Sequence, residues 1–339
     1  MAVPIPTFIR EQPAALDRCV AVARTFASTW AVESFDGVAL VGAGSSFNAL
    51  QVARPRFVAA RRGPVLVYEP QDFVAELSDL RSSPLVIVLS QSGASTRAIE
   101  AARAAVAIGL PTLAVTATPE APLASSGAQV LHLPVGDEPV GPKTKGFIGS
   151  MAMLFMIAEA LGGPRSDPMA GQVLDPLVEQ ARAAAEELVP TLAEVDVVVV
   201  AGRRANHGIA LEASLKIAEM AGVPSVAWPT EELLHGRLHG LTRHSVVFVI
   251  GQGAEELAEA QRVREVMRAR GCRVIVVDPA GAHWPGRVAM PQGPWSALGL
   301  ILPFQWLAVL LAEQRGLDPE AMRYGGLSRE LAIKTDARL

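Results

Sequence analysis

Residues 85–95 read LVIVLSQSGAS, an unbroken apolar run followed by a turn of serine, glutamine and glycine. After this turn, alanine and isoleucine recur at helical spacing to about residue 108. A strand that is apolar at every position is buried on both faces, which is typical of a parallel sheet covered by helices. The stretch therefore predicts a strand, a loop and a helix of an α/β fold.

The same order of strand, glycine turn and helix occurs three more times. Residues 38–46 read VALVGAGSS, residues 197–204 read VVVVAGRR, and residues 246–253 read VVFVIGQG. The two halves of the chain show these units in the same order, which indicates an internal duplication. We therefore expect two doubly wound parallel-sheet subdomains of the flavodoxin-like type. Further strands are expected at residues 113–115, 130–133 and 273–277.

This pattern divides the 339 residues into five segments. A Gly-Gly-Pro turn at residues 162–164 and an Ala- and Glu-rich stretch up to residue 188 separate the two halves. We expect a helical lead at residues 1–34, a first domain at 35–165, a helical connector at 166–190, a second domain at 191–320 and a C-terminal tail at 321–339 that closes the site.

The composition restricts the class of protein. Half of the residues are apolar, 19% are charged and the formal net charge is -4, so a large core is expected and a nucleic-acid partner is not. Two distant cysteines and a start without a secretory pattern indicate the cytoplasm. The most apolar stretch, residues 297–312, contains Pro303 and Gln305 and is shorter than the ~20 residues of a membrane span. We predict a buried helix there and no membrane partner.

The serine-rich loop after residue 89 has the chemistry of an anion site. It lies between a buried strand and a helix, so backbone N–H groups and the helix dipole face the same anion. Ser90, Ser92 and Ser95 add hydroxyl donors, and Ser45 and Ser46 stand at a matching turn. A Walker lysine and a dinucleotide glycine motif are both missing. We therefore predict a site for a phosphate monoester; the alternative is that these serines only cap helices.

These motifs resemble the sugar isomerase (SIS) domain family. The resemblance rests on Gly44-Ser45-Ser46, Ser90-Gln91-Ser92-Gly93 and Thr144-Lys145-Gly146-Phe147. It extends from about residue 35 to about residue 330, in the tandem order of the isomerase part of glucosamine-6-phosphate synthase. Ala94 stands where that synthase usually has glutamate, which weakens any inference of an identical substrate. The resemblance implies phosphate binding by Ser46, Ser90, Gln91, Ser92 and Ser95, and substrate contacts by Gly44, Ser45 and Lys145.

The second half contains a cluster of ionisable residues. Lys216 and Glu219 are three positions apart, on one face of a predicted helix, and His235 follows within EELLHG. Carboxylate and imidazole groups suit the proton transfers of aldose–ketose isomerisation. The resemblance implies that Glu219 is the enolisation base and that Lys216 belongs to the same catalytic group. It also implies that His235 opens the sugar ring and reaches the site of a neighbouring subunit in a homodimer.

Two alternatives for this cluster remain open. Lys216 and Glu219 form a weak surface ion pair if their helix face is exposed. Glu231, His235 and His239 have the i, i+4 spacing of a metal site, but glycines interrupt the helix that such a site needs. We expect no metal and no other cofactor.

The C-terminal tail contains two candidates for one position. In the family that the chain resembles, a tail lysine forms an imine with the open-chain sugar. Here Leu327-Ser328-Arg329 places an arginine at that position, and Leu331-Ala332-Ile333-Lys334 provides a lysine a few residues later. Arginine stays protonated and cannot form the imine. Lys334 is therefore the preferred catalytic amine.

The motifs together indicate an enzyme that acts on a sugar phosphate. The chain does not begin with a cysteine and a glutaminase domain, so glutamine-dependent amination is not expected. The expected function is an isomerase or deaminase of an amino-sugar phosphate such as glucosamine 6-phosphate, which releases ammonia and a ketose 6-phosphate. A deglycase of a fructosamine-type 6-phosphate and a non-catalytic sugar-phosphate-binding regulator are the alternatives. Glu219 and His235, with no room for a DNA-binding segment in the lead, favour the enzyme.

Overall fold

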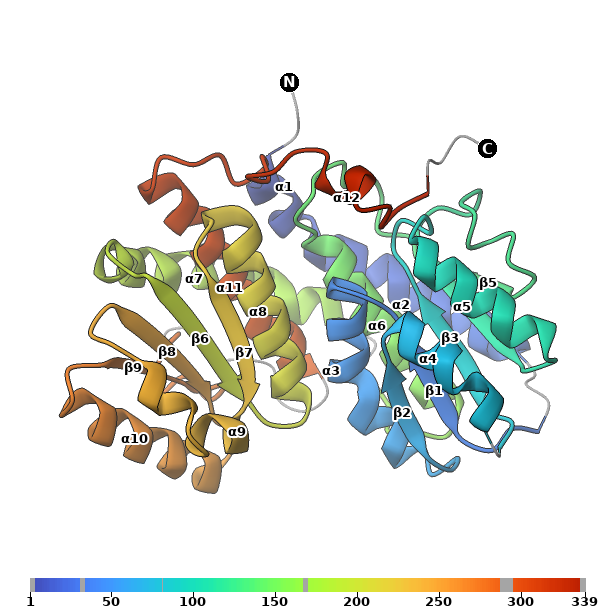
Figure 1. Cartoon of the computed structure of the whole chain (residues 1–339), viewed down its shortest axis with the longest axis horizontal. Helices are drawn as coiled ribbons and strands as arrows, with labels where there is room; N and C mark the ends of the chain where they lie inside the picture. Colours follow the sequence, from blue (N-terminus) through green and yellow to red (C-terminus); the bar gives the residue numbers. More distant parts are fainter. Residues whose placement is uncertain (1–3, 31–33, 81, 167–169, 287–294, 336–339) are drawn as a thin grey trace. The chain divides into compact units, whose positions relative to one another are not determined.

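The computed structural model describes residues 4–30, 34–80, 82–166, 170–286 and 295–335. The chain forms two compact units (Figure 1). We name them after the half of the sequence that supplies the sheet. The first-half unit comprises Ala14–Glu138, Lys145–Pro168 and Tyr324–Leu339, and the second-half unit comprises Met1–Pro13, Pro139–Thr144 and Met169–Arg323.

The sheet of the first-half unit has five parallel strands in the order β2-β1-β3-β4-β5. The central strands β1 and β3 and their neighbour β4 are buried along their whole length, because both of their faces are covered by helices. The strands are β1 (Val38–Val41), β2 (Val65–Tyr68), β3 (Leu85–Leu89), β4 (Thr112–Thr116) and β5 (Gln129–His132).

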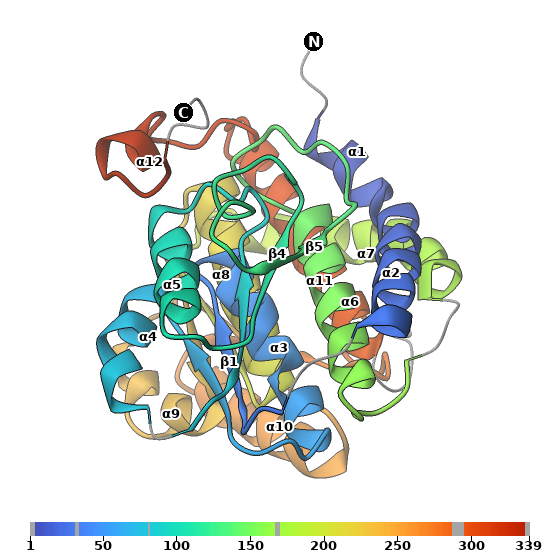
Figure 2. The same ribbon diagram turned by 90° about the vertical axis from the view of Figure 1, so that its right-hand side faces the viewer.

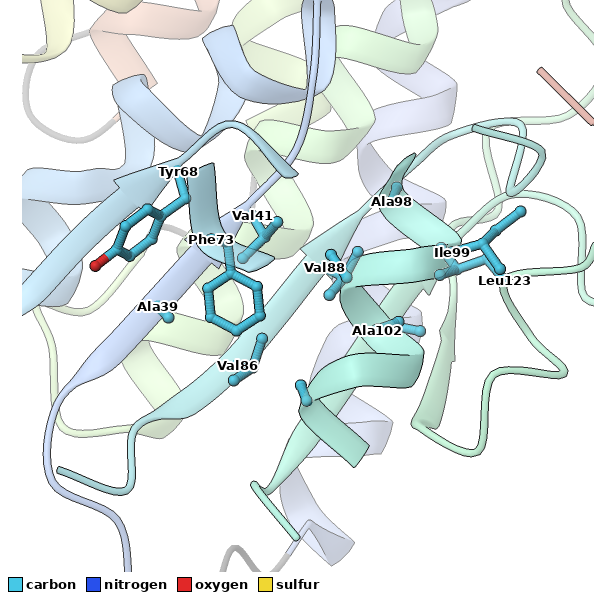
Figure 3. Close-up of a cluster of buried hydrophobic side chains, with 13 residues drawn as sticks. Ala39, Val41, Tyr68, Phe73, Val86, Val88, Ala98, Ile99, Ala102 and Leu123 are labelled. Carbon is cyan, nitrogen blue, oxygen red and sulfur yellow. The ribbon is translucent and has the colours of Figure 1, made fainter. Parts of the chain in front are cut away.

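Helices cover both faces of this sheet. Figure 2 shows α4 and α5 on one side and α2 and α6 on the other, and α3 packs against α6. Under α4 and α5, Phe73 lies edge-on to Tyr68, with 5.7 Å between ring centroids, beside Val41, Val86 and Val88 (Figure 3). The helices are α2 (Gln12–Thr29), α3 (Ser45–Ala59), α4 (Pro70–Glu76), α5 (Thr96–Ala107) and α6 (Lys145–Ala160), with a 3-10 turn η1 (Leu77–Asp79) and the tail helix α12 (Leu327–Glu330).

The second-half unit repeats this architecture with four parallel strands in the order β7-β6-β8-β9. Helices α9 and α10 cover one face of the sheet. Helix α11 packs against both α7 and α8. The elements are β6 (Val197–Gly202), β7 (Ser225–Pro229), β8 (Ser245–Ile250), β9 (Arg273–Val277), α1 (Ile5–Arg10), α7 (Ala170–Leu188), η2 (Val189–Leu192), α8 (Ala205–Ala221), α9 (Thr230–Leu234), η3 (Arg237–Gly240), α10 (Ala254–Arg268) and α11 (Ser296–Gln314).

Helix α11 is the buried helix predicted around residues 297–312, and almost all of its side chains lie in the core. It continues through Pro303, and the amide of Gln12 donates to Gln305 Oε1 over 2.6 Å. It is therefore longer than expected, at 19 residues. Among the described residues it alone is long and apolar enough to cross a membrane, and 83% of its most apolar window is buried. A core helix meets the same criterion, so α11 is no evidence for a membrane.

The predicted fold class is confirmed: two α/β subdomains, each with helices on both faces of a parallel sheet, follow one another in the chain. The first four strands of the larger sheet have the same order as the four strands of the smaller one. The edge strands β2 and β7 were not predicted: they contain the apolar runs VLVY and VAW, but neither run leads into a glycine turn like those after β1, β3, β6 and β8.

The proposed segment boundaries remain predictions. The expected lead, connector and tail each include residues outside the described part of the chain, which are 1–3, 31–33, 167–169 and 336–339. Most of α2 belongs to the first-half unit, and so does the chain from Tyr324 onward.

Candidate functional site

The serine loop of the first-half unit lies where the sequence placed it, between β3 and α5. Gly93 has a φ of +62°, and a Cβ there would lie 2.5 Å from Ala121 Cβ and 2.7 Å from Thr116 Oγ1, so only glycine fits. Ser95 is the N-cap residue of α5 but makes no side-chain capping hydrogen bond. The positive end of a twelve-residue helix therefore faces the loop with the Ser95 hydroxyl beside it.

A second serine turn lies next to this loop. β1 and β3 are neighbouring parallel strands, so the turns that follow them share the carboxyl edge of the sheet. Gly44, with a φ of +57°, is the N-cap residue of α3, which begins at Ser45. Ser45 and Ser46 consequently lie in the first turn of α3. The backbone thus brings the predicted phosphate-binding serines to one edge of one sheet.

Two predicted substrate contacts have interior partners. Gln91 Nε2 donates to Glu138 Oε2 over 3.1 Å, and the backbone N–H of Lys145 donates to Glu138 Oε1, also over 3.1 Å. The Lys145 side chain is buried, and its Nζ lies 3.8 Å from the position that a Cβ on Gly136 would take. The structure therefore places these side chains in the packing beside the loop. Sequence analysis missed Glu138, seven positions before Lys145.

The C-terminal tail runs alongside the serine loop within the same unit. Lys334 forms an isolated antiparallel bridge with Ser95. The backbone N–H of Thr96 donates to Ile333 O over 3.1 Å, and that of Thr335 donates to Ala94 O over 2.9 Å. The Lys334 side chain is exposed. Of the two tail candidates, the geometry favours Lys334.

The acid–base cluster of the second-half unit lies on α8. Lys216 is fully buried, its Nζ lies 3.4 Å from Glu212 Oε1, and it donates to Glu219 Oε2. The Glu212 side chain is fully buried, whereas the Glu219 side chain is 18% exposed. The surface-pair alternative is therefore wrong, because the ammonium lies inside the protein between two carboxylates. Glu212 was missed, although its i, i+4 spacing to Lys216 was a signal.

His235 caps the C-terminal end of α9 and belongs to a separate charged group. Its Nε2 lies 3.0 Å from Glu231 Oε1, and Glu231 Oε2 lies 3.5 Å from an Arg203 nitrogen. Arg203 also donates to both oxygens of Glu259, over 2.8 and 2.9 Å. The side chain of His235 is 72% exposed. Within the second-half unit, His235 is thus directed to the surface.

Burial shifts the pKa values of titratable groups outside these clusters. Burial lowers the pKa of His207, and a backbone hydrogen bond with Trp228 opposes this in part. Burial raises the pKa of the Cys19 thiol to about 12, and both cysteines are free. Within the described ranges, no three His, Cys, Asp or Glu side chains gather as metal ligands would.

Comparison with known proteins agrees with the arrangement of these motifs. The family model for the SIS domain matches residues 36–160 and 191–281. The glutamine–fructose-6-phosphate aminotransferase (isomerizing) of Lactococcus lactis is 26% identical over an alignment of 341 positions, which covers 93% of this chain and 56% of that protein. The chain thus spans about half the length of this relative.

Two solved structures share the fold. Glucosamine-6-phosphate deaminase of Thermotoga maritima superposes with a TM-score of 0.81 at 22% identity, covering 94% of this chain and 97% of that one. The C-terminal domain of the glucosamine-fructose-6-phosphate aminotransferase of Francisella tularensis superposes with a TM-score of 0.78 at 19% identity, covering 93% and 97%. At these identities the structures show a shared fold, and the two family matches show the relationship: the chain is a tandem member of the SIS domain family.

Proposed function

We propose that this chain is a sugar-phosphate isomerase or deaminase that acts on an amino-sugar 6-phosphate. The first-half unit supplies the phosphate site and the tail amine, and the second-half unit supplies the enolisation base. The observation that carries the proposal is the pairing of Lys334 with Ser95. It sets the backbone of an exposed lysine beside the loop whose glycine, serines and helix N-terminus suit a phosphate monoester.

The phosphate would bind at the β3–α5 loop. Ser90, Ser92 and Ser95 are neutral donors, and the helix dipole of α5 favours a negative charge at Ser95. The neighbouring α3 adds Ser46 from its first turn. Anchoring the charged end of the sugar there leaves its carbonyl end for the reactive groups. Among them is the Lys334 amine, which condenses with an open-chain carbonyl to an imine with loss of water; hydrolysis of this imine frees the lysine again.

The proton transfer would use Glu219. In the opened aldose, its carboxylate takes the proton from C2 and returns it to C1, while a second proton passes from the C2 heteroatom to O1; the C1 carbonyl becomes a hydroxymethyl group and the double bond moves to C2. For a 2-amino sugar the product is a C2 imine, which takes up water and releases ammonia to give the ketose 6-phosphate. Lys216, held between Glu212 and Glu219, keeps the catalytic carboxylate on the α8 face.

We further propose that the chain acts as a homodimer. The exposed His235 suits a residue that serves the site of the neighbouring subunit. Its hydrogen bond to Glu231 uses Nε2, which leaves Nδ1 to exchange a proton with the sugar ring oxygen.

A ligand screen with product assays tests the proposed function. The protein is heated with glucosamine 6-phosphate, fructose 6-phosphate, glucose 6-phosphate, an N-substituted fructosamine 6-phosphate or inorganic phosphate. A ligand of the native state raises the melting temperature by an amount that grows with the logarithm of its concentration relative to its dissociation constant. We expect the largest shift with an amino-sugar 6-phosphate, together with release of ammonia and a ketose 6-phosphate. A shift without turnover of any sugar would favour a regulator, and no shift at all would refute the proposal.

A further inference from the structure

Glu138 is a buried carboxylate that contacts the serine loop and that the proposed chemistry does not use. Its side chain belongs to the first-half unit, and the residue is 6% exposed. It accepts a hydrogen bond from Gln91 Nε2 over 3.1 Å. Gln91 stands between Ser90 and Ser92, so the partner of its side chain affects the position of both hydroxyls.

The Glu138 carboxylate also binds the first backbone N–H groups of α6. The backbone N–H groups of Lys145 and Gly146 donate to its two oxygens, each over 3.1 Å. A carboxylate is favourable there, because the first N–H groups of a helix lack partners within the helix and carry its positive dipole end. Glu138 therefore joins the first turn of α6 to the loop between β3 and α5.

Gly146 allows this contact to form. A Cβ at Gly146 would lie 1.9 Å from Gln91 Oε1 and 2.3 Å from Gln91 Nε2, so any other residue would displace the amide. Gln91 is also fixed through its backbone carbonyl, which accepts from Ala117 N over 2.9 Å and from Thr116 Oγ1 over 3.3 Å. The residue in the middle of the loop is thus held by its main chain on β4 and by its side chain on Glu138.

We propose that Glu138 is the positioning residue of the phosphate site. It acts in two ways, and the inference rests on the proposed function of the loop. Through Gln91 it fixes the spacing of Ser90 and Ser92. By filling the N-terminus of α6 with its own charge, it also leaves the N-terminus of α5 at Ser95 as the place where a phosphate is accepted.

The test compares Glu138→Gln with the wild type. Glutamine has the same shape, but it offers one acceptor oxygen, and its NH2 group would face donors. We expect the dissociation constant for the sugar 6-phosphate identified in the screen, and its KM, to rise about tenfold, whereas kcat changes less than about twofold. A merely structural defect would lower kcat as well. Glu159→Gln is the matched control, because Glu159 accepts from Ser166 N over 2.7 Å in the same unit but stands at the opposite end of α6 from Lys145.

A double substitution tests the route through Gln91. If Glu138 acts through this amide, Gln91→Ala combined with Glu138→Gln weakens binding less than the sum of the two single effects. The side-chain NH2 resonance of Gln91, assigned by its loss in Gln91→Ala, should shift in Glu138→Gln with or without ligand. Unchanged binding in Glu138→Gln, or an equal loss of kcat, would overturn the inference. A wild-type protein that binds no sugar phosphate would instead refute the proposed function.

Discussion

Helices α3 and α8 occupy equivalent places in the two units, yet they present different chemistry. Each follows the central strand of its sheet through a turn with matching backbone angles: the N-cap residue is Gly44 at φ 57° and ψ -134° in one, and Arg204 at φ 51° and ψ -122° in the other. Twelve positions after these residues, α3 buries Arg56 and α8 buries Lys216. The duplication thus preserved the backbone and a buried cation.

The partners of the two cations differ. Arg56 donates to Pro164 O and to Ser166 Oγ, over 2.5 and 2.7 Å, and lies over the ring of Phe155. Burial lowers its pKa, and the nearby charge of Glu159 opposes this. Lys216 instead lies between Glu212 and Glu219, whose counterparts on α3 are Val52 and Ala59. Two substitutions on one helix face therefore separate a structural cation from a candidate acid–base group.

The two units also differ at the carboxyl edges of their sheets, where the first-half unit has the predicted anion site. In the first-half unit the N-terminus of α5 faces an uncharged loop of serines. In the second-half unit, donors at this edge are already bound to carboxylates of the same unit. Arg203 donates to Glu259, and the backbone N–H of Gln252 donates to Glu256 Oε2 over 2.9 Å. In the second-half unit carboxylates thus occupy this edge, whereas in the first-half unit the first N–H of α5 donates to a neutral carbonyl, that of Ile333.

The largest effect is expected from removing the buried cations. Lys216→Met leaves the fully buried Glu212 without its ammonium, so the free energy of unfolding should fall by about 3–5 kcal/mol. Arg56→Met removes hydrogen bonds to neutral acceptors, for which we expect about 1–3 kcal/mol. Urea titrations followed by circular dichroism measure both. Equal losses would mean that the two helices do not differ as described.

The next effect concerns the anion edge. Ser95→Asp gives the first-half unit the carboxylate that the second already has, and a unit charge near the phosphate costs several kcal/mol at short range. Binding of the sugar phosphate should weaken at least about 100-fold by calorimetry. The melting temperature should not fall, since aspartate is a good N-cap residue. Ser95→Ala is the control with a smaller loss; binding by Ser95→Asp within threefold of the wild type would contradict an open site.

Substitutions at the N-cap residues of α3 and α8 should change the free energy of unfolding by a smaller amount. Nothing lies within 4 Å of a Cβ at Gly44, so Gly44→Ala should destabilise through its backbone angle alone, by about 1–2 kcal/mol. Arg204→Gly relieves the same strain and should stabilise by up to about 1 kcal/mol, after the greater chain entropy of glycine is subtracted. Thermal unfolding of both variants shows whether each substitution lowers or raises stability. Opposite signs from those expected would show that the turns are not equivalent.

The smallest effect is a dependence of stability on pH that comes from His207. The counterpart of His207 on α3 is Phe47. Because burial lowers the pKa of His207 below its usual 6.5, the unfolded chain binds the proton more tightly than the folded one. Its contribution to stability is complete above pH 6.5 and declines as the pH falls below that value. His207→Phe should therefore reduce the loss of stability between pH 7 and pH 5 in urea titrations. An unchanged difference would exclude His207 as its source.

The sequence predicts the elements whose signals are local. The apolar runs of β1, β3, β6 and β8 identify both sheets, and the i, i+3 spacing of Lys216 and Glu219 identifies the face of α8. The edge strands β2 and β7 were missed because their short apolar runs are not followed by the glycine turn that marks the inner strands. Glu138 was missed because its partners are backbone N–H groups and an amide brought close only by folding. The preference for Lys334 over Arg329 came from the chemistry of the two side chains and stays a prediction, whereas the pairing of the tail with Ser95 was not visible in the sequence.

The central claim is that phosphate binding and proton transfer come from different units. Glu219→Gln tests it most directly, with binding of the sugar 6-phosphate measured by calorimetry and turnover measured in parallel. We predict a dissociation constant within about twofold of the wild-type value and a kcat at least about 100-fold lower. Loss of binding together with turnover, or turnover that persists in the variant, would contradict the claim.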